Sequence, residues 1–303
     1  MSNDKPAAIS AEQVKQLRER TGAGMMECKK ALVDSGGDLD AAAELMRKQG
    51  LAKADKKAAR VAAEGVVTAA ISADGRTAAL VEVNCETDFV ARGAEFGEFA
   101  AAVAKAALAG GLADVAALSA AKLPSGETVD ERRRALVAKI GENLSIRRVA
   151  LQTAGGFLGA YLHGSRIGAL VALEGGNAEL ARDLAMQVAA SNPRFLRVAD
   201  VAADELARER GIAVEQLKLD PKNANKPEAM LGKIVEGKVT KVFAEQSLLT
   251  QPFIKDDKQT IEKLLQSAQA KVTAFTRYEV GAGIEKVKED YVAEIQKQVR
   301  GAS

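Results

Sequence analysis

The first fifty residues carry apolar positions that recur with the period of an α-helix. Ser10 followed by Gln13 forms a capping-box pattern at the start of the first helix. A Gly-rich break and a Ser-Gly-Gly turn separate this helix from the next two, and Gly50 is expected to end the third. The predicted second and third helices cover residues 25–33 and 39–49. The pattern predicts a compact three-helix unit followed by a charged helical connector over residues 51–64.

From Gly65 the apolar pattern changes to the alternation of β-strands. Asp74-Gly75 is a hairpin signal between the first two strands. The predicted strands cover residues 66–71, 78–83, 144–152, 157–162, 167–173 and 270–280. The predicted helices cover residues 95–108, 129–140, 179–190, 200–219 and 227–246, with a weaker helical region before 124 and an amphipathic helix from Ile284. The order of elements predicts an α+β fold.

Two segments suggest that the middle of the chain is duplicated. Residues 79–83 and 169–173 have similar sequences, and each lies just before a predicted helix. Residues 200–246 form a predicted αα-hairpin around a Pro- and Asn-rich turn. The expected domains are 1–55, a three-helix unit similar to ubiquitin-associated domains; 56–145, a core N-subdomain; 146–195 with 247–282, a core C-subdomain; 196–246, a helical hairpin for dimerisation; and 283–303, a C-terminal helical module.

The stretch from Asn84 to Ala91, called the corner below, is the strongest candidate for function. It leads from a predicted apolar strand into a long Ala-rich helix, and such strand ends commonly carry functional side chains. Two interpretations stay open for Asp88 and Phe89. They are either a helix-start charge with a packed aromatic, or an acidic and an aromatic group presented to a partner.

Composition narrows the classes of function. Apolar residues make up 47% and charged residues 28% of the sequence, as in ordinary globular proteins. A length of 303 residues predicts two or three domains. A net charge of +2, no basic stripe and no Trp argue against direct nucleic-acid binding. The N-terminus resembles no signal or transit peptide, and no stretch is apolar enough to span a membrane. With Cys28 and Cys85 as the only cysteines, we expect a reducing cytoplasm and no disulfide framework.

The residue types of the chain do not predict an enzyme. His163 is the single histidine, so a zinc site with the usual ligands is not expected. No phosphate-binding loop or nucleophile elbow occurs, and we expect neither an enzyme nor a bound cofactor. Met25 and Met26 fit either a core or an interface, the two cysteines fit a core, and His163 fits a structural or a contact role.

The motifs of the chain resemble bacterial elongation factor Ts along nearly its whole length. The main resemblance lies in Thr-Gly-Ala-Gly-Met-Met-Glu-Cys-Lys-Lys-Ala-Leu at residues 21–32 and Val-Asn-Cys-Glu-Thr-Asp-Phe-Val-Ala at residues 83–91. Shorter matches follow in the family's order at residues 138–143, 146–149, 163–168, 188–191, 251–253 and 277–281. Residues 123–128 look like a small insertion outside these motifs.

The resemblance implies a guanine-nucleotide exchange factor for the translational GTPase, elongation factor Tu. Thr87, Asp88, Phe89 and Val90 would press against the GTPase, with Phe89 in an apolar pocket and Asp88 disturbing the Mg²⁺ and phosphate site. Further contacts would come from Arg18, Met25, Met26 and His163. The hairpin would form a homodimer in members that dimerise, and the C-terminal helix would dock on its own protein or on the partner.

Two other functions follow from the residues alone. The three-helix unit by itself fits a non-catalytic protein-binding scaffold, as its likeness to ubiquitin-associated domains is only a fold analogy. An enzyme would require chemistry that the residues above do not supply. Acceleration of GDP release from the GTPase separates the exchange factor from both.

Overall fold

The computed structural model describes residues 9–219 and 226–285, apart from the side chains of residues 51–55. The chain forms two compact units. Unit 1 contains the described residues up to 68 together with 81–149 and 279–285, and unit 2 contains 69–80 and 150–278. Both combine helices with β-sheet, which confirms the predicted α+β class with an N-terminal helical segment. The predicted helix from Ile284 lies almost wholly outside the described residues.

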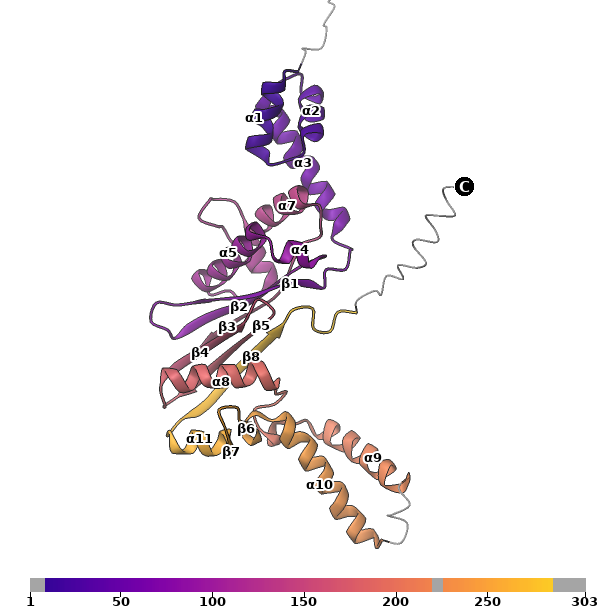
Figure 1. The fold of residues 1–303 in the computed structure, drawn as a ribbon, viewed down its shortest axis with the longest axis vertical. Coiled ribbons are helices and arrows are strands. Elements are labelled where there is room, and N and C mark those ends of the chain that lie inside the picture. The colour runs from indigo at the N-terminus through magenta and orange to yellow at the C-terminus, as the bar shows by residue number, and fades with distance from the viewer. Residues whose placement is uncertain (1–8, 220–225, 286–303) are drawn as a thin grey trace, which may run out of the picture. The chain divides into compact units, whose positions relative to one another are not determined.

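Unit 1 begins with three helices that share a small core (Figure 1). They are α1 (Ala11–Thr21), α2 (Met25–Asp34) and α3 (Leu39–Lys57). The capping box predicted at Ser10 and Gln13 is present, and Gly22 ends α1 in the left-handed conformation. Six buried side chains from the three helices pack together: Val14, Leu17, Cys28, Ala31, Leu32 and Ala42. The predicted three-helix unit is therefore confirmed as a set of helices.

The prediction that Gly50 ends the third helix was wrong. Helix α3 continues to Lys57, through part of the expected connector. A glycine inside a helix costs only about 1 kcal/mol, which packing readily offsets. A side chain at Gly50 would place its Cβ 3.1 Å from the Cβ of Ala138 in α7 (Val129–Ile140), so glycine allows these two helices to approach closely.

The remainder of unit 1 is built from sheet strands and the helices between them. These elements are β1 (Glu64–Ile71), β2 (Thr77–Cys85), α4 (Asp88–Ala91), α5 (Ala94–Gly110), α6 (Val115–Ala120), α7 (Val129–Ile140) and β3 (Ser145–Thr153). The three strands lie in the order β1-β2-β3 and contribute residues to both units. Helices α5 and α7 pack together and bury Phe96, Phe99 and Leu136. The single-turn helix α4 was not predicted.

A buried acid ties the chain after β8 (Lys271–Glu279) to β2. Glu82 is fully buried, and its carboxylate pairs with Arg147 at 3.0 Å and with Arg148 Nε at 2.6 Å. The same carboxylate accepts a hydrogen bond from the Gly281 amide at 2.8 Å. A buried charge is tolerated only when it is paired and hydrogen-bonded, as this one is.

Unit 2 contains a second sheet, in the order β4-β5-β8, with a helix against it (Figure 1). The elements are β4 (Phe157–His163), β5 (Ile167–Glu174), α8 (Ala178–Ser191) and β8 (Lys271–Glu279). Strands β4 and β5 pair antiparallel from Phe157 opposite Leu173 to His163 opposite Ile167. Helix α8 lies so close to β4 that a Cβ on Gly159 would stand 1.9 Å from the Ala181 carbonyl oxygen.

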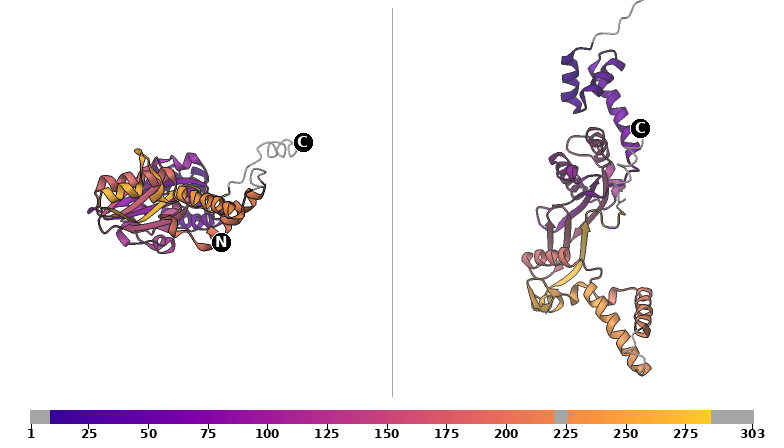
Figure 2. Two further views of the ribbon diagram at one scale, coloured as in Figure 1. Left: turned by 90° about the horizontal axis from the view of Figure 1, so that it is seen from below. Right: turned by 45° about the vertical axis from the view of Figure 1, so that its right-hand side comes forward.

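Two long helices of unit 2, α9 (Ala203–Leu219) and α10 (Glu228–Gln246), pack against each other (Figure 2). Their shared core includes Leu217, Val239 and Phe243, and Arg210 pairs with Glu236 at 2.7 Å. The short elements nearby are η1 (Val198–Asp200), η3 (Leu248–Thr250), β6 (Pro252–Phe253), β7 (Asp256–Thr260) and α11 (Ile261–Ser267). Strands β6 and β7 and helix α11 were not predicted.

Candidate functional site

The corner begins where β2 ends and turns at once into the short helix α4 (Figure 1). Thr87 caps α4 with extended backbone angles, and its hydroxyl accepts a hydrogen bond from the Val90 amide at 3.4 Å. Asp88 is the first residue of α4, where the helix dipole favours a negative charge. After Gly93 the chain enters α5. The sequence therefore places Thr87, Asp88, Phe89 and Val90 within one helical turn and its cap.

Phe89 points away from the core of unit 1. It is 82% exposed, and no residue of α4 is buried. Asp88 is half-exposed and pairs with Arg92 at 2.9 Å, four residues further on. A large exposed aromatic beside a charge contributes little to folding, and such groups often form the centre of an interface. Of the two interpretations left open, the packed one does not fit Phe89.

Hydrogen bonds from the turn after α7 hold the base of the corner. The carboxylate of Glu142 accepts from the amides of Glu86 and Thr87 at 3.1 and 3.0 Å, and from the Thr87 hydroxyl at 2.6 Å. In return, the Glu86 carboxylate accepts from the Asn143 amide at 2.6 Å. Residues 138–143 carry one of the family-like motifs, but nothing in their residue types indicated this support.

Cys85 lies fully buried beneath the corner, as predicted. Its Sγ is 3.1 Å from the Thr87 carbonyl oxygen, to which the thiol donates. Burial, followed by the negative charges of Glu142 and Glu64, raises the pKa of the Cys85 thiol to about 12. The thiol is therefore protonated at neutral pH and unsuited to nucleophilic chemistry.

Three of the other predicted contacts belong to helices α1 and α2 of unit 1. Arg18 is exposed, and Met25 and Met26 are 59% and 76% exposed at the start of α2. The core interpretation of the two methionines therefore fails. Adjacent flexible thioether side chains on a surface are common at protein interfaces.

The remaining candidate, His163, belongs to unit 2. It ends β4 at the hairpin before β5 and is exposed. Its Nδ1 lies 3.3 Å from the Tyr161 hydroxyl, and the two rings are tilted at a centroid distance of 6.3 Å. The histidine therefore stands on the surface beside an aromatic neighbour, and among the described residues it has no acidic partner of the kind that a general base commonly has.

Unit 1 contains a cavity of about 750 Å³. Side chains from α1–α3 and α7 line it, many of them charged. Among these, Arg20 pairs with Asp40, and Lys139 with Glu95. In the described part of the chain no cluster of three or more His, Cys, Asp or Glu side chains is placed to hold a metal ion. No helix there is long and apolar enough to cross a membrane.

These features are those of a protein that acts by binding another protein. An exposed acid and aromatic stand on a hydrogen-bonded strand-to-helix corner of an α+β protein, and the described residues gather no catalytic constellation around them. Such a surface is suited to contact with another protein.

Sequence comparison then identifies the family: the chain belongs to the Elongation factor TS family, whose sequence model matches residues 86–282. It is 52% identical to elongation factor Ts of Xylella fastidiosa strain 9a5c over 291 residues, covering 96% of this chain and 98% of that protein. It is also 52% identical to elongation factor Ts of Methylococcus capsulatus, covering 97% and 100%. For the Xanthomonas campestris strain B100 protein the values are 53%, 96% and 98%. The predicted resemblance is confirmed, and the chain is a translation elongation factor.

Proposed function

We propose that this protein is the guanine-nucleotide exchange factor of the translational GTPase elongation factor Tu. Membership of the family and its relatives' name, elongation factor Ts, support this role. The observation that carries it is the exposure of Phe89 next to Asp88, on a corner whose backbone is fixed by hydrogen bonds. The protein would accelerate GDP release without making or breaking a covalent bond.

The mechanism follows from the way a GTPase holds its nucleotide. Mg²⁺ and the phosphate-binding loop supply much of that grip. Phe89 enters an apolar pocket between helices of the GTPase, and Asp88 disturbs the loop and waters that position Mg²⁺. The complex then favours the nucleotide-free GTPase, and by linkage bound nucleotide weakens the hold of the exchange factor. A coupling free energy of about 4 kcal/mol changes affinity by roughly a thousandfold.

Other surfaces extend the contact in this proposal. Arg18, Met25 and Met26 meet the GTPase beside the corner, and His163 contacts it elsewhere. The α9–α10 pair is the hairpin that joins two copies where the protein dimerises, and Ile212 and Met230 are 45% and 50% exposed on it. The same proposal includes the five domains predicted from the sequence, with duplicated core subdomains and a C-terminal helical module over residues 283–303.

The test is the release of fluorescent GDP from elongation factor Tu, followed by stopped flow with rising concentrations of this protein. We expect the rate to rise by several orders of magnitude and to saturate. Release at the spontaneous rate in the presence of excess protein would overturn the proposal. Hydrolysis of GTP by the isolated protein would instead point to an enzyme.

A further inference from the structure

The short helix that presents Asp88 and Phe89 has no fully buried side chain. None of its four residues is buried, and its dominant side chain points into solvent. A single helical turn is unstable by itself, because nucleation fixes several residues for one hydrogen bond. Hydrophobic packing by itself therefore does not account for the orientation of α4, because its apolar residues Val90 and Ala91 are only partly buried.

The carboxylate of Glu142 is the group that takes this role in the described structure. Its Oε2 accepts from the amides of Glu86 and Thr87, and its Oε1 accepts from the Thr87 hydroxyl at 2.6 Å. The same hydroxyl accepts from the Val90 amide, so the contact continues directly into the cap of α4. Hydrogen bonds to a charged acceptor are about twice as strong as neutral ones.

The hydrogen bonds between the corner and the turn after α7 are reciprocal. The Glu86 carboxylate accepts from the Asn143 amide, and it lies 3.5 Å from the Arg60 guanidinium. The Asn143 side chain donates to the Arg60 carbonyl oxygen at 2.8 Å. Corner, turn and the chain before β1 are thus joined by one polar network.

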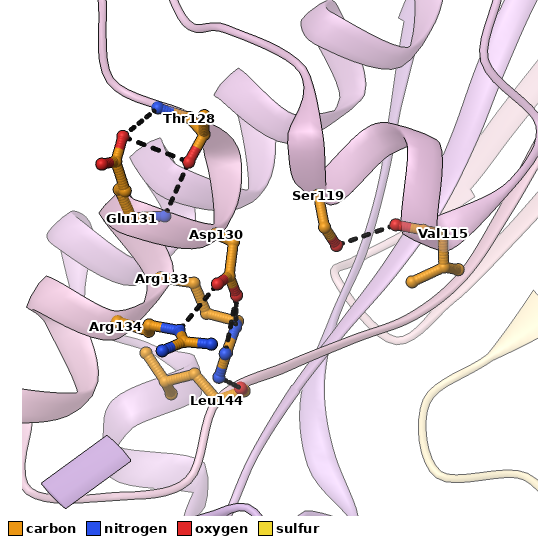
Figure 3. A network of polar contacts seen from close by, with 8 residues as sticks. All are labelled: Val115, Ser119, Thr128, Asp130, Glu131, Arg133, Arg134 and Leu144. Atoms are coloured by element: carbon orange, nitrogen blue, oxygen red, sulfur yellow. Dashed lines mark hydrogen bonds and ion pairs between the residues drawn. The ribbon is translucent and has the colours of Figure 1, made fainter. Parts of the chain in front are cut away.

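The turn that carries Glu142 is itself fixed at both ends. Gly141 ends α7 in the left-handed conformation. On the far side, Arg133 donates to the Leu144 carbonyl oxygen at 3.0 Å, and Asp130 pairs with the same guanidinium at 2.7 Å (Figure 3). A capping box between Thr128 and Glu131 anchors the start of α7 (Figure 3). The carboxylate of Glu142 is therefore presented from a rigid support.

We infer that Glu142 is a positioning residue for nucleotide exchange: it fixes the angle at which α4 presents Phe89 and Asp88, without touching the partner itself. The inference rests on the proposed function and assigns this role to a residue outside the corner. A pre-ordered contact surface avoids the entropy cost of ordering the corner when the partner binds. Loss of Glu142 would release the corner while Phe89 and Asp88 both remain in place.

The first experiment measures GDP release from elongation factor Tu with full-length Glu142→Ala and Glu142→Gln. We expect the saturating rate to fall about tenfold for alanine, which removes every acceptor. Glutamine keeps one acceptor oxygen and should recover part of the loss. Glu262→Ala is the matched control, because it removes an exposed glutamate from the first turn of α11, in unit 2, and should leave release within about twofold. Equal rates for Glu142→Ala and the unmodified protein would overturn the inference.

A double-mutant cycle separates positioning from a general loss of structure. If Glu142 acts through Phe89, then adding Glu142→Ala to Phe89→Ala should slow release by less than about twofold. An equal slowing in both backgrounds would show that the two residues act independently and would reject positioning through Phe89. Thermal unfolding of each variant identifies any protein that has simply lost its fold, in which case Glu142→Gln carries the cycle.

Hydrogen–deuterium exchange gives a result that does not depend on the proposed function. Glu142→Ala should raise amide exchange over residues 86–91 while α5 stays protected. Unchanged protection of the corner would overturn the inference even if GDP release were slow. If the unmodified protein fails to accelerate release, the proposed function falls, and hydrogen exchange alone then decides whether Glu142 orders the corner.

Discussion

Two strand-to-helix turns, one in each unit, are built from similar parts and serve different ends. After β2 the chain makes the extra turn α4 and leaves Phe89 82% exposed. After β5 it passes through Gly175 and Gly176, both in the left-handed conformation, straight into the Asn177 cap of α8. A Cβ on Gly175 would stand 2.2 Å from the Gln269 carbonyl oxygen. The first turn projects side chains into solvent, and the second has no room for one.

This difference indicates whether a substitution should affect the stability of the protein or its contacts with a partner. A turn packed backbone against backbone contributes to stability, and its substitution should leave partner contacts alone. A turn with no buried residue contributes little to stability, so its side chains are free to serve a partner. Substitutions in the two turns should therefore separate loss of stability from loss of activity.

Gly175→Ala should destabilise the protein by about 3 kcal/mol, because it combines left-handed backbone strain with the clash against Gln269. Urea denaturation followed by circular dichroism measures the free energy of unfolding. Gly164→Ala is the matched control: its φ is +59°, but nothing lies within 4 Å of the added Cβ, so strain alone should cost about 1 kcal/mol. Equal losses for both variants would mean that packing at the β5 turn is unimportant.

Phe89→Ala should slow stimulated GDP release about thirtyfold, the expected effect of removing an aromatic from the centre of an interface. The free energy of unfolding should stay within about 0.5 kcal/mol of the unmodified protein, because the ring is exposed. Stopped-flow release and urea denaturation measure the two quantities. Phe157→Ala, which truncates a partly exposed phenylalanine of β4, should leave release unchanged. Normal exchange by Phe89→Ala would remove Phe89 from the contact.

Asp88→Asn should slow release about fivefold, since one charge acting on the Mg²⁺ site of the partner is worth about 1 kcal/mol. The defect should shrink when Mg²⁺ is chelated, because the step that Asp88 assists is then already complete. Arg92→Gln removes the same surface ion pair but keeps the acid, and it should have little effect. A defect that is insensitive to Mg²⁺ would assign Asp88 to binding alone.

Cys85 should give the smallest effect, because it only packs beneath the corner. Iodoacetamide at pH 8 should leave the Cys85 peptide unmodified until the protein unfolds, as peptide mapping by mass spectrometry would show. Burial raises the pKa of this thiol from 9.0 to about 12, so the unfolded chain releases the proton first. The resulting stability is full below pH 9.0 and is lost as the pH rises toward 12. Rapid modification of the native protein would contradict the buried assignment.

Much of the fold was predictable because local signals agreed with packing. Helix α7 spans Val129–Ile140 as predicted, since Thr128 and Glu131 cap it and Gly141 ends it. Gly50 misled because its meaning depends on Ala138, far away in the sequence. The ribbon β6–β7 has no apolar alternation. It is held partly by Gln187, whose side chain donates to the Pro252 carbonyl oxygen and accepts from the Ile254 amide, and sequence patterns do not reveal such contacts.

The candidate site divides in the same way. The corner was visible because an apolar strand, a capping Thr87 and an acid–aromatic pair are adjacent in the chain. Exposure of Phe89 decided between the two interpretations, and residue type alone does not determine exposure. The role of Glu142 could not be predicted from the sequence, because it depends on contact with residues more than fifty positions earlier.

The ion pairs of the buried Glu82 with the partly exposed Arg147 and Arg148 have a consequence for how such a chain can diverge. An isolated change of Glu82 to a neutral residue would remove the counter-charge that Arg147 and Arg148 share, and the Gly281 amide would lose its acceptor. Such an intermediate would be strongly selected against. Descendants of this sequence should therefore keep all three residues or exchange them together, and substitutions at these positions should be statistically coupled across lineages.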